Sequence, residues 1–201
     1  MNSKILWDIK AWLYARFRRV FPFGKILDDE NRALKSLLAQ IPLTRGVVID
    51  LGTGTGNALD IVPADFVRIG LDSNFEMLKF AKQQISGYYI QSDILNAALK
   101  SDSADILIMC GVWEYIKNRA FLVSEILRII KRNGYAVMTY SPPKPLTSLR
   151  ILLGLKIYPI AEERMYEYLN VNGLKIMALR RCMLQHQILI KKTESNGTSQ
   201  I

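Results

Sequence analysis

Residues 47–56 read VVIDLGTGTG, an apolar run that ends in an aspartate and leads into three alternating glycines. A continuously apolar run is typical of a strand that is buried on both faces of a sheet. Glycines directly after such a strand predict a tight strand-to-helix turn, because the missing side chains let a ligand approach the backbone closely. By itself the pattern also fits a phosphate loop or a plain turn.

The chain beyond this turn alternates between short apolar runs and helical stretches, which predicts parallel strands joined by crossover helices. Half of the 201 residues are hydrophobic and 22% are charged, a balance typical of a folded domain. The expected strands are residues 46–50, 67–72, 88–92, 105–110 and 134–140. The expected helices between them are residues 55–61, 74–84 and 118–130, the last ending at Asn133-Gly134.

The two ends of the chain are expected to add further elements. Apolar residues at helical spacing predict an amphipathic helix over 4–21, which Pro22 and Gly24 would stop. A second helix is expected from about 28 to 40, with its acidic residues in the first turn. After the fifth strand the pattern gives no assignment for 146–160, then predicts a helix over 162–171 and a terminal pair of strands at 174–183 and 185–192.

Two more aspartates end predicted strands in the manner of Asp50. Asp72 closes the second strand, where an acid can accept hydrogen bonds from both ribose hydroxyls. Asp93 follows the third strand, where its carboxylate could accept from an adenine amino group. A single aspartate at such a place is usually a cap or turn residue, but three along one sheet edge favour a nucleoside-bearing ligand.

With these features the chain resembles the class I S-adenosylmethionine-dependent methyltransferases, and among them the small-molecule group called methyltransferase type 11. The resemblance is carried by residues 48–56, 70–74, 77–78, 91–94, 111–116 and 127–135. It implies a Rossmann-like α/β fold, with a mostly parallel seven-stranded sheet, an antiparallel last strand, helices on both faces and an N-terminal helical extension. It also implies S-adenosyl-L-methionine as the cofactor and S-adenosyl-L-homocysteine as the product.

The resemblance further implies which residues contact the cofactor. The turn would lie against its methionine portion through Asp50, Gly52, Thr53, Gly54 and Gly56. The next two strand ends would hold the ribose and adenine through Asp72, Ser73, Met77, Asp93 and Ile94. The segment after the fourth strand would pass beneath the sulfonium through Cys110, Gly111 and Val112.

We expect one domain over residues 1–192, divided into three parts and followed by a disordered tail at 193–201. The parts are an N-terminal helical lid or extension at 1–42, a cofactor-binding core at 45–140, and a substrate-side region with the terminal strands at 141–192. A dinucleotide-dependent dehydrogenase is the nearest competing interpretation. Its glycine spacing is G-x-G-x-x-G, whereas here the three glycines alternate, and it has no required role for Asp93.

Because the methyl group of such a cofactor is already activated, the protein mainly has to align a nucleophile and exclude water. If the acceptor must lose a proton, the candidate bases near the fourth and fifth strand ends are Glu114, Tyr115 and Tyr140. His186 alternates with apolar neighbours and is expected to be a packed core histidine. The two cysteines have no zinc-site spacing, so we expect no metal.

The formal charge of +9 is concentrated near the two ends of the chain. The basic helix at 4–21 could cover the site as a lid, pack on the sheet, lie on an anionic membrane surface through residues 4–25, or bind RNA. As a lid it would bring Tyr14 to the ligand, with Trp113 as a second substrate contact. We favour a small lipophilic or aromatic acceptor over nucleic acid.

The remaining alternatives are an RNA methyltransferase and an inactive ligand-binding module. Asp8 and Lys10 interrupt any signal-peptide core, and no apolar run is long enough to span a bilayer. The expected location is therefore the cytoplasm, with peripheral contact at the inner membrane surface as an open option. The sequence does not define an oligomeric state.

Overall fold

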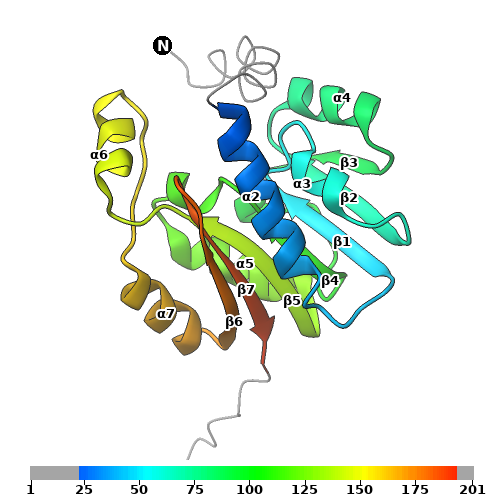
Figure 1. Cartoon of the computed structure of the whole chain (residues 1–201). Coiled ribbons are helices and arrows are strands. Elements are labelled where there is room, and N and C mark those ends of the chain that lie inside the picture. The colour runs from blue at the N-terminus through cyan, green and yellow to red at the C-terminus, as the bar shows by residue number, and fades with distance from the viewer. Residues whose placement is uncertain (1–22, 194–201) are drawn as a thin grey trace, which may run out of the picture.

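The computed structural model describes residues 23–193, in which seven strands form one sheet in the order β3-β2-β1-β4-β5-β7-β6 (Figure 1). The strands are β1 (Gly46–Leu51), β2 (Phe66–Asp72), β3 (Tyr88–Gln91), β4 (Ala104–Met109), β5 (Ile130–Tyr140), β6 (Leu174–Arg181) and β7 (His186–Lys192). Strand β7 pairs antiparallel with both β5 and β6, and the other pairings are parallel. The prediction of a mostly parallel sheet with an antiparallel last strand is confirmed.

Helices cover both faces of this sheet, as the continuously apolar strands required. The helices are α2 (Phe23–Leu38), α3 (Asn57–Ile61), α4 (Phe75–Gln84), α5 (Arg119–Ile129), α6 (Pro145–Leu152) and α7 (Glu162–Val171). Along β4 the side chains alternate between two hydrophobic clusters: Leu107 packs with α5 and α7, while Ile106 packs with α2 and α3. Both faces of the sheet are therefore buried.

The predicted end of the fifth helix at Asn133-Gly134 is wrong. Helix α5 ends at Ile129, and Asn133 lies inside β5 with a φ of 58°. Between the pairs Ala104↔Ile130 and Ile106↔Tyr135 the register shifts, so these residues form a bulge. Asparagine tolerates the left-handed conformation in a bulge as readily as after a helix, which explains why the sequence signal was ambiguous.

Both chain ends also depart from the predictions. Helix α2 already includes Gly24, so this glycine does not stop a helix, and Asp28 lies in the second turn instead of the first. Thr193 is ordered by a hydrogen bond from its backbone N–H to Gly173 O (3.0 Å), although the tail was expected to begin there. The predicted helix at 4–21, with Tyr14, lies outside the described residues.

The unassigned segment after β5 forms an arm that carries α6. We call residues 141–161 the α6 arm; in Figure 1 its helix (yellow) stands away from the sheet. Leu152 and Leu153 at its tip are 82% and 75% exposed. Within residues 23–193 no helix has the length and apolar character needed to cross a bilayer.

Candidate active site

The three aspartates predicted for the site lie along the carboxyl edge of the sheet, at or just after the ends of neighbouring parallel strands. Asp50 pairs with Gly70 on one side and Ile108 on the other, so it is at the end of the central strand β1. Asp72 is the last residue of β2 and pairs with Gln91, two residues before Asp93. Open α/β sheets bind ligands at this edge, where the strand order reverses between β1 and β4.

The glycine turn is held by backbone hydrogen bonds to the end of β2. The N–H groups of Gly52 and Thr53 both donate to Leu71 O at 2.8 Å. All three glycines of the turn have positive φ, with Gly54 at 52°. A Cβ on Gly52 would clash with Val112, whereas a Cβ on Gly54 would meet nothing within 4 Å. The backbone at Gly54 therefore borders open space that a ligand can fill.

Asp72 is fixed by the same turn. Its Oδ2 accepts a hydrogen bond from Gly54 N (2.9 Å) and its Oδ1 accepts one from Asn74 N (2.9 Å). Burial raises the pKa of this carboxyl, while the backbone N–H groups of Asn74, Gly54 and Ser73 partly offset that effect. Carboxylate oxygens can accept more than one hydrogen bond each, so Asp72 can still accept from ligand hydroxyl groups.

Asp50 is buried at the base of the turn, with 1% of its surface exposed. Its Oδ2 has no hydrogen-bond partner among the described residues. Burial raises the pKa of Asp50 to about 7, the Thr53 hydroxyl lowers it, and the neighbouring Asp72 charge raises it further. A buried carboxylate without a partner is costly, so this atom points to a ligand that donates a hydrogen bond or carries positive charge.

These two carboxylates argue against a phosphate ligand at the glycine turn. A dinucleotide site offers free backbone N–H groups to its pyrophosphate, but here Asp72 already accepts from Gly54 N. Negative charge on Asp72, beside the buried Asp50, would repel a phosphate. The turn instead suits a cationic, ribose-bearing ligand, which disfavours the dehydrogenase alternative.

The residues predicted to contact adenine lie beyond the ends of β2 and β3, in different environments. Met77 is buried near the start of α4, and Ser73 is exposed at the end of β2. Asp93 is exposed and accepts from Leu95 N (2.9 Å), so it caps the short 3-10 helix η1 (Ile94–Asn96). Ile94 packs partly against the core. The cap explains why an aspartate is at position 93, and its contact with adenine stays a prediction.

The end of β4 forms the other side of the turn. Gly111 has a φ of 69°, and its N–H donates to Thr139 Oγ1 at 2.7 Å. A Cβ on Gly111 would find only Gln185 Nε2, at 3.9 Å, while Val112 packs against Gly52. Cys110 is half-buried beside them. The structure therefore brings the predicted segment 110–112 next to the glycine turn.

The burial of three further predicted residues argues against direct roles in catalysis or substrate contact. Trp113 is fully buried and packs edge-on against Tyr168, with ring centroids 5.9 Å apart. Tyr140 is buried, its hydroxyl lies 3.1 Å from His186 Nδ1, and burial raises the pKa of Tyr140 far above its usual value. Glu114 is also fully buried, in the 3-10 helix η2 (Trp113–Tyr115).

Glu114 is enclosed by partners that the sequence did not indicate. Its Oε1 accepts from Arg150 Nη2 (3.2 Å) and from Gln185 Nε2. The ion pair and both hydrogen bonds involve Oε1, while Oε2 is buried without a partner among the described residues. Because no part of Glu114 is exposed, it is poorly placed to act as a base. Of the three candidate bases, only Tyr115 reaches solvent, at 37% exposure.

His186 is a packed histidine, as predicted, but it has polar partners. Besides the Tyr140 hydroxyl, Lys144 Nζ lies 2.9 Å from its Nε2. Burial and the Lys144 charge lower the pKa of His186, which keeps the ring neutral. Within residues 23–193 no three His, Cys, Asp or Glu side chains are grouped so that they could hold a metal ion.

The strand order, the glycine turn and its carboxylates together define the class I methyltransferase architecture. Residues 49–138 match a family described as "Methyltransferase domain". The family match and the fold together support a class I S-adenosylmethionine-dependent methyltransferase domain in this part of the chain.

Similar proteins include the malonyl-[acyl-carrier protein] O-methyltransferase of Marinomonas sp. (strain MWYL1), 32% identical over 65% of this chain and 52% of that protein. The trans-aconitate 2-methyltransferase of Azoarcus sp. (strain BH72) is 31% identical over 55% of this chain and 45% of its own length. The chain thus spans about half the length of these curated relatives.

Among solved structures, the magnesium protoporphyrin IX methyltransferase of Synechocystis PCC 6803 with bound SAH has a TM-score of 0.75. The alignment covers 96% of this chain and 100% of that chain, at 18% identity. At this level of identity the likeness concerns the fold.

Proposed function

We propose that this chain transfers a methyl group from S-adenosyl-L-methionine to a small lipophilic or aromatic acceptor. The observation that carries the proposal is the buried Oδ2 of Asp50, which has no partner among the described residues and lies at the base of the glycine turn. The open backbone at Gly54 leaves room for a ligand there. A cationic amino acid moiety would supply the missing donor and charge.

The cofactor supplies a methyl group that its sulfonium already activates. The residues of the chain then have to bind the cofactor, orient the acceptor and exclude water. Asp72 would hold the ribose, and the amino group would meet Asp50. Further contacts would come from the turn, from the residues after β2, β3 and β4, and from the start of α4, through Gly52, Thr53, Gly54, Gly56, Ser73, Met77, Asp93, Ile94, Cys110, Gly111 and Val112.

The proposal is tested by calorimetry with S-adenosylmethionine and S-adenosylhomocysteine. Asp72→Ala should weaken both affinities at least tenfold, because hydrogen bonds to a charged group contribute roughly 1.5–3 kcal/mol. Asp65→Ala is the matched control, since Asp65 is exposed at the other end of β2. Equal affinities in wild type and Asp72→Ala, with both proteins folded, would contradict the proposed site.

The lipophilic character of the acceptor is supported by the α6 arm. The arm follows β5 at the carboxyl edge and exposes several large apolar side chains: Leu149, Ile151, Leu152, Leu153, Leu155 and Tyr158. Residues 141–161 contain no acidic residue. Of their three basic residues, Arg150 is paired with Glu114 and Lys144 contacts His186, while Lys156 is exposed. We infer that the arm, with residues 4–25, makes peripheral contact with an anionic membrane, which vesicle flotation can test.

A further inference from the structure

A cavity lies on the α5–α7 side of the sheet, and none of its lining residues belongs to the glycine turn. Its volume is about 500 Å³, which is in the range of small-molecule sites. It is lined by the start of α5, by α7 and by the segment before α7. The fully buried Trp113 packs between Arg119 and Tyr168 of its lining.

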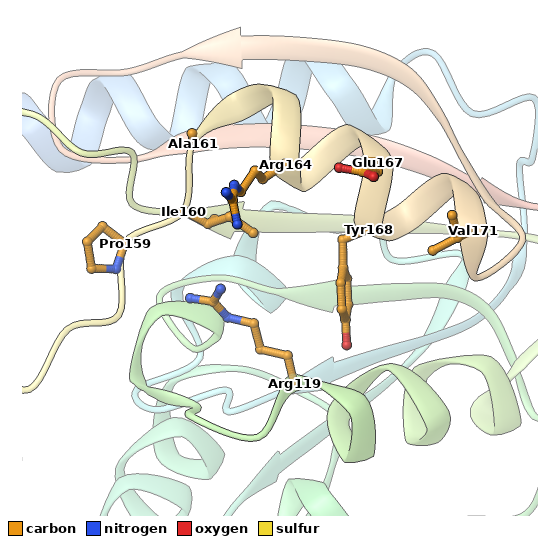
Figure 2. A pocket seen from close by; sticks show the side chains of 8 residues that line it. All are labelled: Arg119, Pro159, Ile160, Ala161, Arg164, Glu167, Tyr168 and Val171. Atoms are coloured by element: carbon orange, nitrogen blue, oxygen red, sulfur yellow. The ribbon is translucent and has the colours of Figure 1, made fainter.

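Two guanidinium groups extend into this cavity from opposite walls (Figure 2). Arg119 is the first residue of α5, and Arg164 lies in the first turn of α7. Neither forms an ion pair with a carboxylate of the described residues. The one carboxylate in the lining, Glu167, makes no ion pair with either arginine, so the two guanidinium groups leave an excess of positive charge that favours a bound anion.

Arg119 is positioned firmly. Its Nη2 donates to Tyr158 O, and its guanidinium lies 5.4 Å from the centre of the Trp113 ring. Its Nε is buried and has no hydrogen-bond partner among the described residues. The guanidinium is therefore preorganised, and one of its donors is unsatisfied in the structure.

The helix ends add to the positive potential. Arg119 begins α5, and Ala161, the residue before α7, lines the cavity. Neither Asn118 nor Ala161 caps its helix with a side chain. The first turn of α7 has two acidic residues, Glu162, which pairs with Arg181, and the exposed Glu163. Neither lines the cavity, and Glu167 is the only carboxylate in its lining. The Tyr168 ring and Ile160 offer an apolar wall beside the two arginines.

We propose that this cavity is an oxyanion-binding site for a small organic acid or phosphate ester. The carboxylate or phosphate lies between Arg119 and Arg164, and the apolar part of the ligand lies against Tyr168. Guanidinium groups favour these anions because their donors match the spacing of the oxygens. The site is distinct from the cofactor site and does not depend on the proposed methyl transfer.

The test is a titration of the full chain, followed by the NMR signal of the Arg119 Nε–H group, with sodium benzoate and with inorganic phosphate at constant ionic strength. Saturable shifts are expected with at least one anion. Arg164→Gln should weaken that affinity about fivefold or more, because a charge-assisted hydrogen bond is lost. Arg132→Gln removes the same charge from an exposed position in the β5 bulge and should change nothing.

Glu167→Gln adds an opposite expectation, because removing the one carboxylate in the lining should tighten binding about twofold or more. Binding of benzoate alone assigns the site to organic acids, and binding of phosphate alone assigns it to phosphate esters. The absence of saturable shifts with either anion, or equal affinities in Arg164→Gln and Arg132→Gln, would overturn the proposal. Calorimetry with S-adenosylmethionine should be unchanged in Arg164→Gln, which separates this result from any failure of the cofactor site.

Discussion

The Asp50 side chain makes folding less favourable, because its carboxyl is buried and one oxygen has no donor among the described residues. Such groups in native proteins are usually retained for binding or catalysis. If Asp50 binds a cationic ligand as proposed, it lowers the stability of the free protein and raises its affinity for that ligand.

Replacing Asp50 by asparagine should reveal this trade as a pH dependence of stability. The pKa of Asp50 is about 7 in the folded chain, against an ordinary value of 3.8. Between these values the folded state binds a proton that the unfolded state does not, so the wild type loses stability as pH rises from 4 to 7. Asp50→Asn removes that loss.

Urea unfolding at pH 4 and pH 8 measures the effect. Relative to wild type, Asp50→Asn should gain about 2 to 4 kcal/mol more at pH 8 than at pH 4. Its affinity for S-adenosylmethionine should fall at the same time. A stability difference that stays constant with pH would show that Asp50 does not titrate in this range.

The open space beside Gly54 can be tested by comparing Gly54→Ala with Gly154→Ala. Both glycines have positive φ, 52° and 90°, and a Cβ on either would meet nothing within 4 Å. Alanine at each position should therefore cost about 1 to 2 kcal/mol of backbone strain. Only Gly54→Ala should also weaken cofactor binding, by tenfold or more, because its methyl group would occupy the ligand space.

Thermal unfolding and calorimetry on the two variants separate strain from binding. Similar losses of stability with unequal losses of affinity are expected. If Gly154→Ala weakened cofactor binding as much as Gly54→Ala, the space beside Gly54 would not be the cofactor site.

The sequence predicted the positions of Asp50 and Asp72 because a strand end is a local signal. It could not predict that Glu114 is enclosed, because its partners are distant in the chain, at Arg150 and Gln185. Trp113 and Tyr140 show the same limit, since their burial depends on α7 and β7. Local pattern thus located the strand ends at the carboxyl edge of the sheet but not the surroundings of the candidate bases.

At the scale of elements, the α6 arm is attached to the sheet by an ion pair between Arg150 and the fully buried Glu114. Arg150→Ala would leave that carboxylate uncompensated and should destabilise the chain by about 3 to 5 kcal/mol. Combining it with Glu114→Gln should recover much of the loss, because the buried charge is then removed. Urea denaturation of both single variants and the double variant gives the coupling energy, and additive effects would refute the coupling.

Strands and long helices were predicted closely where periodicity was strong, as for α7, whose bounds at Glu162–Val171 agree with the expectation. The end of α5 was missed because Asn133-Gly134 satisfies the conformations of a helix end and of a bulge equally well. Helix α6 was missed because it exposes apolar residues that a folded domain usually buries.

At the scale of the whole molecule, the formal charge of +9 and the exposed arm lead to a prediction about membrane binding. The chain should float with anionic vesicles, and added salt should reduce flotation. Leu152→Glu should lower the affinity about tenfold, because burying a leucine side chain contributes roughly 1.5–3 kcal/mol. Met177→Glu, at an exposed position on β6, is the control and should bind normally.

Removing residues 1–25 tests the N-terminal contribution in the same assay. Flotation that is unaltered both by this truncation and by Leu152→Glu would remove the membrane component from the proposed function. Loss of flotation in only one of the two would assign the contact to that part of the chain.

The place of β7 between β5 and β6 has a consequence for synthesis on the ribosome. Strand β6 joins the sheet only through β7, which follows it in the chain. While the chain emerges, β1 to β5 can pair, but β6 has no neighbour until residues 186–192 have left the exit tunnel. Until β7 emerges, the nascent protein therefore exposes the edges of β5 and β6 that β7 later covers, and such edges are open to misassociation.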